Sequence, residues 1–412
     1  MHVTPVYLSP EQNDKLRRVL TPTIPIYPSP PTSSFPTLHI IPKDFLRDLL
    51  IKLREHSIEI SAIRLHGGAA SYVLINDSDF VYRDIDILFL IKTSLSSQQQ
   101  TTLFSSNNEP YLCDVWTIIK YIISSLLDTY SKKNIKITSD QDSWALLSLQ
   151  NLLGQNLELK FVENLKRQWQ FSVDSFQIDL KPLLFEKINP ESITTQIQTK
   201  IYSAYKDVHQ AMHHLNHKLI CTYEPETIRG GGLLKYCDLL ARNYKPYDIA
   251  IMIHMQRYMC SRFCIDYKTS PEQIHVIAQY VATHFLPSSI ISNLHITNNV
   301  NEIFQHRSYL QSQLLNSKYD SNQIDQADLI NARLCLLFFE YLADVIQQST
   351  VCLTHEDREL LLMNILYLKE SYHYEYEHLF INDSQHHQKY HVYNHPHHRN
   401  NTTMNSNRSV YF

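Results

Sequence analysis

The chain has 412 residues, of which 43% are hydrophobic, so it is long enough for two domains with sizeable cores. No apolar run approaches the ~20 residues of a membrane helix, and no signal-peptide pattern opens the chain. The formal net charge of −4 excludes a chain that binds nucleic acid through its overall charge. Seven scattered cysteines without a Cys-x-x-Cys pair indicate neither a disulfide framework nor a zinc ribbon, so we expect a reducing compartment, the cytoplasm and also the nucleus.

The first half of the chain predicts a mixed sheet with flanking helices. Residues 1–34 carry seven prolines and few periodic apolar residues, which predicts a flexible, extended arm. Residues 96–109 are rich in Ser, Gln and Asn and predict a surface loop. The spacing of apolar residues predicts helices over 45–53, 69–75 and 115–127, and strands over 58–65, 82–91, 144–149, 157–162 and 171–180. Residues 35–200 are therefore expected to form an α+β domain.

The second half predicts a helical domain, over residues 201–372, because strand patterns fade after about residue 200. Helical spacing runs through 204–219, 233–242, 249–263, 271–285, 329–347 and 355–372. From residue 373 onward the chain is rich in His, Tyr and Asn, which predicts a disordered tail over residues 373–412.

Glycine is the most informative residue type, since the chain contains only six. Five of them fall in two clusters, Gly67-Gly68 and Gly230-Gly231-Gly232. A chain that otherwise avoids glycine is expected to need close backbone approach at both places, to a ligand or within a tight turn. We favour the ligand, because each cluster has charged neighbours.

The first glycine pair lies beside an Asp-x-Asp pattern. The predicted strand over 58–65 leads into Gly67-Gly68 and then a helix, whose free N–H groups attract phosphate. Asp84 and Asp86 are two residues apart on the next predicted strand and so project from the same face. Two adjacent carboxylates repel each other unless a divalent cation lies between them. A phosphate-binding turn beside such a pair predicts phosphoryl-group transfer with Mg²⁺.

A third carboxylate is expected from residues 171–180, which offer Asp174 and Asp179. The two are five residues apart, so they should point to opposite faces of a strand. Asp174 is placed mid-strand among aromatic residues, where an unpaired acid would be costly, whereas Asp179 is near the strand end. We therefore select Asp174.

Basic residues around the second glycine cluster predict contacts with the triphosphate or with the RNA backbone. Arg229 and Lys235 are the predicted nucleotide-binding residues. Arg242 and Lys245 fit the same cationic patch and equally an ordinary solvated helix face. Three residues precede the Asp174 segment: Lys166, Arg167 and Trp169. They could stack on RNA and neutralise its charge, but the tryptophan is equally compatible with a buried position.

The chain resembles the terminal nucleotidyltransferase family five, formerly "family with sequence similarity 46", which comprises atypical poly(A) polymerases. The matching runs are FPTL (35–38), GGAASYVL (67–74), YRDIDILF (82–89), LELKFV (157–162), FSVDSFQI (171–178), IRGGGLLKY (228–236), RYMCSRF (257–263) and TVCL (350–353). They extend in the family's order from about residue 35 to about residue 372.

The resemblance implies a polymerase-β-like nucleotidyltransferase domain followed by a helical domain. It further implies ATP as the donor, Mg²⁺ or Mn²⁺ as the metal and mRNA 3′ ends as the acceptor. The family's acids fall on Asp84, Asp86 and Asp174, which are the predicted catalytic and metal-binding residues. The family also associates with endoplasmic-reticulum-anchored proteins that carry fibronectin type III domains.

The chain departs from the family's glycine-serine turn at Gly68, which lacks the serine hydroxyl. One hydrogen bond to a charged group is worth ~1.5–3 kcal/mol. The sequence thus predicts a poly(A) polymerase that uses two metal ions. Two alternatives stay open: a catalytically weakened pseudoenzyme that acts as a scaffold, and a nucleotidyltransferase with another nucleotide or acceptor.

Overall fold

The computed structural model describes residues 5–28, 34–76, 80, 82, 84–92, 102–104, 110–112, 115–138, 142–149, 151, 156–165, 169–186, 198–205, 207–285, 326–349 and 353–373. The predicted tail over 374–412, together with Lys166 and Arg167, lies outside these residues. No described helix is both long enough and apolar enough to cross a membrane.

An eight-stranded sheet forms the first part of the molecule. Its strands in spatial order are β1 (Val6–Tyr7), β12 (Lys200–Ser203), β11 (Phe176–Asp179), β4 (Ile60–His66), β5 (Asp84–Ile91), β10 (Asn156–Leu165), β9 (Asp142–Leu149) and β8 (Ser131–Thr138). Every neighbouring pair is antiparallel except β5 and β10, which run parallel. The four strands predicted over residues 58–65, 82–91, 144–149 and 157–162 are confirmed by β4, β5, β9 and β10.

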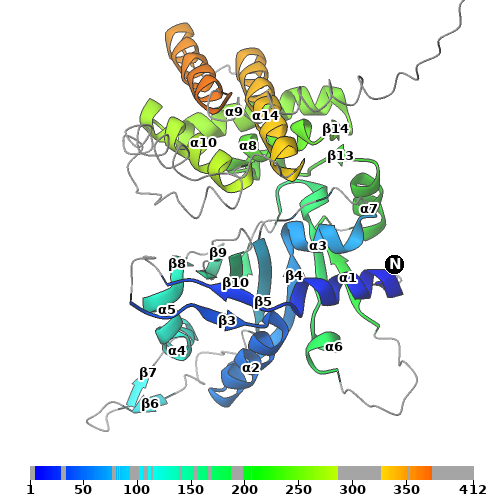
Figure 1. Ribbon diagram of the computed structural model, residues 1–412, viewed down its shortest axis with the longest axis vertical. Helices are drawn as coiled ribbons and strands as arrows, with labels where there is room; N and C mark the ends of the chain where they lie inside the picture. The colour runs from blue at the N-terminus through cyan, green and yellow to red at the C-terminus, as the bar shows by residue number, and fades with distance from the viewer. Residues whose placement is uncertain are drawn as a thin grey trace, which may run out of the picture.

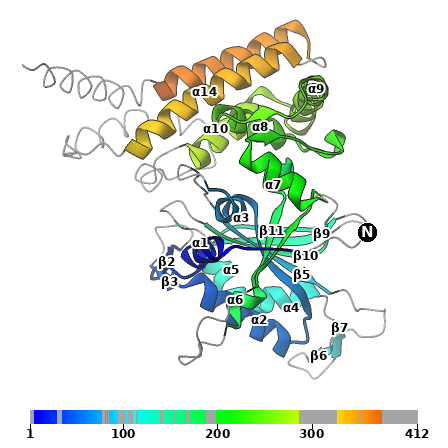
Figure 2. The ribbon, with the colours of Figure 1, turned by 90° about the vertical axis from the view of Figure 1, so that its right-hand side faces the viewer.

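Helices lie on both sides of this sheet (Figures 1 and 2). Below it in both views lie α2 (Pro42–Glu55), α4 (Val115–Ile122), α5 (Ser124–Tyr130) and α6 (Lys181–Leu184). Above the sheet lies the helical part, formed by α7 (Val208–Asn216), α8 (Gly231–Ala241), α9 (Ile249–Asp266), α10 (Ser270–His284), α14 (Gln326–Ser349) and a helix over residues 355–373. The predicted α+β fold, with a mixed sheet followed by helices, is confirmed.

One large core joins the sheet to the helices on either side of it. It contains apolar side chains of the sheet such as Ile85, Ile87 and Phe89, and of the helical part such as Phe263 and Phe338. A second, smaller cluster lies on the opposite face of the sheet and contains Leu88, Trp144, Leu146 and Val162. The domain boundaries at residues 35, 201 and 373 stay predictions.

The prediction of an extended N-terminal arm over residues 1–34 is wrong for residues 5–28. They form β1, then α1 (Pro10–Leu20), then β2 (Ile24–Ile26), which pairs with β3 (Leu38–Ile40). Ser9 caps α1 with a capping box, and Pro10 takes the first helical position, where its missing N–H is harmless. Proline thus starts a helix here rather than preventing one.

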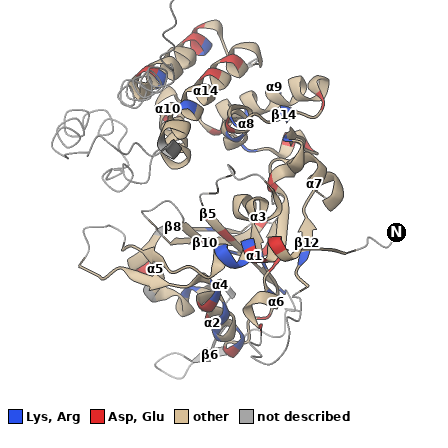
Figure 3. Ribbon diagram, turned by 45° about the vertical axis from the view of Figure 1, so that its right-hand side comes forward, with Lys and Arg blue, Asp and Glu red and all other residues tan. Residues whose placement is uncertain are grey.

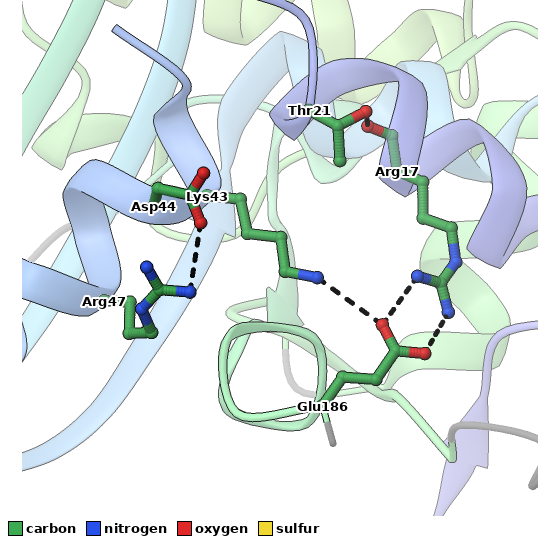
Figure 4. Close-up of polar contacts among 6 residues, drawn as sticks. All are labelled: Arg17, Thr21, Lys43, Asp44, Arg47 and Glu186. Atoms are coloured by element: carbon green, nitrogen blue, oxygen red, sulfur yellow. Dashed lines mark hydrogen bonds and ion pairs between the residues drawn. The ribbon is translucent and has the colours of Figure 1, made fainter. Parts of the chain in front are cut away.

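Charged residues fix this N-terminal segment to the domain (Figure 4). Arg17 donates two hydrogen bonds to the Glu186 carboxylate, at 2.7 and 2.8 Å, and Nζ of Lys43 lies 3.5 Å from the same group. Leu16, Leu20 and Ile26 are at most 1% exposed. The segment is therefore part of the domain's core.

Two smaller differences concern local structure. The predicted loop over 96–109 contains β6 (Thr102–Phe104), which pairs with β7 (Pro110–Leu112). A second short pair, β13 (Leu219–Ile220) with β14 (Lys245–Pro246), lies within the helical part, where no strand was predicted.

Candidate active site

The Asp-x-Asp pattern lies on β5, one of the central strands. Ile85 and Ile87 are fully buried in the main core, whereas Asp84 and Asp86 lie on the other face and are only partly buried. This alternation is the expected consequence of strand geometry. The two carboxylates therefore share a face of the sheet, as predicted.

The neighbouring strand β10 places polar side chains beside both aspartates. Asn156 pairs in register with Asp84 and donates a hydrogen bond of 2.9 Å to its Oδ1. Glu158 pairs in register with Asp86, and the two carboxyl groups share a hydrogen bond. Asp84, Asp86 and Glu158 thus form a set of three acids on two adjacent parallel strands.

Gly67 provides the close approach that the glycine pair predicted. It follows the last residue of β4, opens α3 (Gly67–Leu74) and has φ of +68°, a value that glycine adopts without strain. A Cβ atom at this position would lie only 2.7 Å from Oδ2 of Asp86. The turn therefore brings the N-terminus of α3 into contact with the Asp86 carboxylate, and only glycine fits there.

The acids of this cluster shift the ionisation of Asp86. Burial and the negative charge of Asp84 raise the pKa of Asp86 to about 6, although Lys160 and Lys235 partly oppose this. A carboxyl group with such a pKa lacks a strong cationic partner in the protein itself. A divalent cation would supply that partner.

Asp174 lies in a different local structure from the one predicted. A strand was expected over 171–180, but residues Ser172–Asp174 form a 3₁₀ turn, η1, and β11 begins only at Phe176. Hydroxyl groups stabilise this turn: Ser175 donates to the Ser172 carbonyl at 2.6 Å, and Ser71 of α3 donates to the Val173 carbonyl at 2.7 Å. Serine side chains compete for backbone groups in this way, and so the strand begins later than predicted.

Lys235 of α8 is the partner of Asp174. Its Nζ lies 3.4 Å from Oδ1 of Asp174. Burial alone would lower the pKa of Lys235, but Asp174 and Asp238 outweigh that effect and hold the pKa above its usual value. Lys235 also lowers the pKa of Asp86, so its positive charge acts on both aspartates.

The second glycine cluster is explained by packing within the helical part. A Cβ at Gly232 would meet Ile228, and a Cβ at Gly230 would lie 3.1 Å from Asp266 and from Tyr267. The backbone N–H of Gly230 donates a hydrogen bond of 2.8 Å to Asp266. Gly230 lets the start of α8 approach the end of α9, and Gly232 makes room for Ile228. Packing therefore explains these glycines without a bound ligand.

The predicted cationic patch is divided among separate acidic partners. Arg229 contacts Asp142 at 3.4 Å, and Arg242 contacts Asp238 at 2.6 Å. Figure 3 shows acidic and basic residues dispersed over both parts of the described chain. Of the predicted basic residues, Lys235 is the one with an electrostatic effect on Asp86.

The acids present fit a hard divalent cation. Within the part of the chain that the structure describes, no three Asp, Glu, His or Cys side chains are gathered into a ready-made metal cluster, and this holds for Asp84, Asp86 and Glu158 as well. The predicted group of Asp84, Asp86 and Asp174 stays a prediction. Mg²⁺ nevertheless needs only one or two carboxylates and takes the rest of its shell from water and phosphate. The raised pKa of Asp86 is the condition that such an ion relieves.

Glu158 is an acidic neighbour of Asp86 that the sequence pattern alone did not single out. The signal was present in the strand 157–162, where Glu158 and Lys160 alternate with apolar residues. An acid inside a buried strand is costly unless it has a function or a partner, which is the argument already applied to Asp86. Strand pairing, which the sequence does not state, was needed to place it beside Asp86.

Comparison with known proteins identifies the family of the chain. A family model described as "Nucleotidyltransferase" matches residues 8–368. Terminal nucleotidyltransferase 5B of Mus musculus is 37% identical over 283 residues, which are 68% of this chain and 66% of the relative. Terminal nucleotidyltransferase 5C of Rattus norvegicus is 38% identical over 285 residues, 67% of this chain and 71% of the relative.

Terminal nucleotidyltransferase 5D of Homo sapiens is 38% identical over 281 residues, which are 66% of this chain and 70% of the relative. The matched part of the chain spans about two thirds of the length of these relatives. The Asp-x-Asp strand, the glycine turn and every strand of the large sheet except β1 fall within the matched residues. The chain therefore belongs to the terminal nucleotidyltransferase 5 family of nucleotidyltransferases.

Proposed function

We propose that the chain is a poly(A) polymerase that adds AMP from ATP to the 3′ ends of mRNA. The observation that carries this proposal is the set of three acids on β5 and β10 beside the N-terminus of α3. Carboxylates that bind a metal next to a phosphate-binding turn are the minimum for nucleotidyl transfer. ATP as the donor and RNA as the acceptor come from the family membership.

Asp84, Asp86 and Glu158 would hold Mg²⁺ or Mn²⁺. The bound cation supplies charge neutralisation for the phosphates and a more acidic 3′-hydroxyl. We infer that Glu158, rather than the predicted Asp174, is the third acid, because Glu158 is in register with Asp86 whereas Asp174 pairs with Lys235. Asp174 then has a positioning role toward Lys235.

The remaining residues bind the triphosphate and guide the transfer. Backbone N–H groups of Gly67 and Gly68 at the start of α3 donate to phosphate oxygens, and Lys235 neutralises their charge. The RNA 3′-hydroxyl oxygen attacks the α-phosphorus in line, and its proton passes to Glu158. The bond from the α-phosphorus to the bridging oxygen breaks, and pyrophosphate leaves.

The direct test is the incorporation of labelled ATP onto an oligo(A) primer by the purified chain with Mg²⁺ or Mn²⁺. We expect tails of adenylate and their loss in an Asp84→Ala, Asp86→Ala double variant. Tails that persist in this double variant would refute the proposal. A competition among the four nucleotides separates poly(A) addition from uridylation.

A matched pair of variants tests the third acid. Glu158→Gln and Asp174→Asn each remove one negative charge with little change of shape. If Glu158 holds the metal, Glu158→Gln should abolish transfer, and excess Mn²⁺ should restore part of it. Asp174→Asn should mainly raise the KM for ATP, because Lys235 loses its partner. The reverse pattern would return the third-ligand role to Asp174.

Selection of the mRNA is proposed to depend on a partner protein. The net charge of −4 offers little general affinity for RNA. The family resemblance points to an endoplasmic-reticulum-anchored partner with fibronectin type III domains, at the cytoplasmic side. Copurification of such a partner with the full chain tests this, and its absence from purified complexes would count against it.

A further inference from the structure

A pocket of about 340 Å³ lies on the sheet near β11 and β12, away from the three acids. Its lining combines one cation, two aromatic rings and small polar groups: Arg64, Leu165, Trp169, Gln177, Tyr202, Ser203 and Ala204. None of these residues has a part in the proposed metal site. This combination is typical of a site for one nucleotide, which offers a negative phosphate and a flat base.

The pocket and the acids lie on the same face of the sheet. Asp86 pairs in register with His66, His66 with Gln177, and Gln177 with Tyr202. Residues directly opposite each other on neighbouring strands share a face. Arg64 precedes His66 by two residues on β4 and therefore shares this face as well. With a strand spacing of about 4.8 Å, the pocket is on the order of 10–15 Å from Asp86.

Arg64 is a buried cation whose nearest charged neighbour is Asp179, the residue opposite it on β11, which acts on it through its charge and not through an ion pair. Its guanidinium donates a hydrogen bond of 2.6 Å to Gln177 and lies 4.0 Å from the centroid of the Tyr202 ring. Among the described residues no carboxylate is within ion-pair distance of Arg64, and its Nε is buried without a hydrogen-bond partner. Burial lowers the pKa of Arg64, while the arginine remains charged.

The contrast with the other arginines of the chain sharpens this point. Arg17, Arg242 and Arg262 each contact a carboxylate at 3.0 Å or less. Arg64 is instead preorganised by a neutral amide and by an aromatic ring. An arginine in such a setting has N–H groups of its guanidinium left for an anion in the pocket.

Trp169 supplies an aromatic surface at the rim of the pocket. The edge of its ring system packs against Tyr205 at 5.3 Å and against Tyr223 at 6.4 Å, which fixes its orientation. A fixed indole is a platform on which a base can stack, worth about 1–3 kcal/mol per base in single-stranded complexes. The sequence is compatible with Trp169 stacking on RNA and equally with a buried position. In the structure Trp169 packs against Tyr205 and also lines the pocket.

We propose that this pocket binds one nucleotide of the acceptor RNA, upstream of its 3′ end. The phosphate is held by Arg64 and the base stacks on Trp169. At the ~3.4 Å rise of a stacked strand, 10–15 Å correspond to about three or four nucleotides. The assignment rests on the proposed function, in which the 3′-hydroxyl lies at the three acids.

The test compares primers of different length with the full chain. Arg64→Gln should raise the KM for a twelve-nucleotide oligo(A) about tenfold. The same variant should leave the KM for a dinucleotide primer (ApA) and the KM for ATP unchanged, because neither molecule is long enough to reach from the three acids to the pocket. Arg47→Gln is the matched control, since Arg47 is an exposed arginine of α2 that contacts Asp44, and it should change none of these values.

A second arm measures RNA binding without catalysis. Fluorescence anisotropy of labelled oligo(A) with the Asp84→Ala, Asp86→Ala variant should still report binding, and Arg64→Gln or Trp169→Leu in that background should weaken it. These two variants remove different parts of the pocket, so loss in both, with unchanged circular dichroism, supports the proposal. If the chain transfers no nucleotide at all, this arm still decides the role of the pocket.

Three results would overturn the inference. The first is unchanged affinity for oligo(A) in both Arg64→Gln and Trp169→Leu. The second is an equal rise in the KM for the dinucleotide and for the long primer. The third is weakened binding of ATP by Arg64→Gln, which would assign the pocket to the donor nucleotide instead.

Discussion

Asp86 in the sheet and Asp238 in the helical part are both removed from much of the solvent, but their surroundings carry opposite charges. Asp238 is 3% exposed and accepts hydrogen bonds from Arg242 at 2.6 Å and from Tyr280 at 3.0 Å. Burial by itself would raise the pKa of Asp238, and Arg242 and Lys235 reverse this and lower it. At Asp86, burial and the negative charge of Asp84 raise the pKa to about 6, and Lys160, Glu158 and Lys235 oppose this only in part.

We propose that this difference separates an acid that stabilises the fold from an acid of the active site. At Asp238 the protein supplies every charge that the carboxylate needs, so the group joins α8 to α10. At Asp86 the cations of the protein offset burial and the charge of Asp84 only in part, so a divalent cation would complete the neutralisation. The following predictions test whether this contrast holds.

The largest expected effect is the opposite response of the two aspartates to amidation. Asp86→Asn should lower the rate of nucleotidyl transfer by at least about 100-fold, because a metal-binding charge is lost. The same change should raise the melting temperature of the metal-free chain. Asp238→Asn should instead lower the free energy of unfolding by about 3 kcal/mol, because Arg242 is left without its partner.

Transfer assays and calorimetry on both variants measure this contrast. Similar effects of the two changes on stability would end the distinction between the two aspartates. Asn364→Ala, at an amide of the helical part that binds Ser270, serves as a control for changes remote from either acid.

The two glycine clusters extend the comparison. Gly67→Ala should reduce transfer about 100-fold, since its Cβ would displace the Asp86 carboxylate and the residue would be strained at φ of +68°. Gly231→Ala is the matched control, because nothing lies within 4 Å of its Cβ position. A steady-state assay of both variants decides, and a fully active Gly67→Ala chain would show that the turn is not part of the site.

The pH dependence of metal stabilisation follows from the raised pKa of Asp86. The folded chain holds the proton more tightly than the unfolded chain, so metal-free stability should fall as pH rises from about 4 to above 6. Mg²⁺ binds only the ionised form, so it should raise the melting temperature at pH 7.5 and hardly at pH 5.

Thermal melts with and without Mg²⁺ at the two pH values test this. Asp86→Asn should remove the difference between them. An equal effect of Mg²⁺ at both pH values would show that the ion binds elsewhere.

The sequence predicted the elements better than it predicted their pairing. The α+β class, the strands β4 and β5 and the same-face placement of Asp84 and Asp86 follow from periodicity, which is a local property. Glu158 and the Asp174–Lys235 contact depend on strand order and on the packing of α8 against the sheet. Neither is encoded in the spacing of residues along the chain.

The η1 turn shows a further limit of local patterns. Residues 171–180 have the composition of a strand, yet the hydroxyls of Ser175 and Ser71 donate to the carbonyls of Ser172 and Val173, and a turn forms first. The prolines within residues 5–28 led to the wrong prediction of an extended arm for a related reason. Proline at the start of a helix and proline in an extended arm look alike until the capping residue Ser9 is taken into account.

The smallest expected effect belongs to Gly68, where the family has serine. The position has room for a side chain, since the nearest atom to its Cβ would be Cβ of Tyr82 at 3.7 Å. Gly68→Ser should therefore fold normally and lower the KM for ATP severalfold through one added hydrogen bond to phosphate. A gain of several hundredfold would instead favour the weakened pseudoenzyme, and saturation kinetics with ATP distinguish the two.

The attachment of the N-terminal segment by Glu186 has a consequence for shortened versions of this chain. A transcript or a proteolytic cut that starts the protein at Phe35, where the family motifs begin, would remove β1 from β12 and α1 from α3. Leu74 and other apolar groups covered by α1 would become an exposed hydrophobic surface, and Glu186 would lose its ion pair with Arg17. Such a truncated product would carry every catalytic acid and would still aggregate and be degraded.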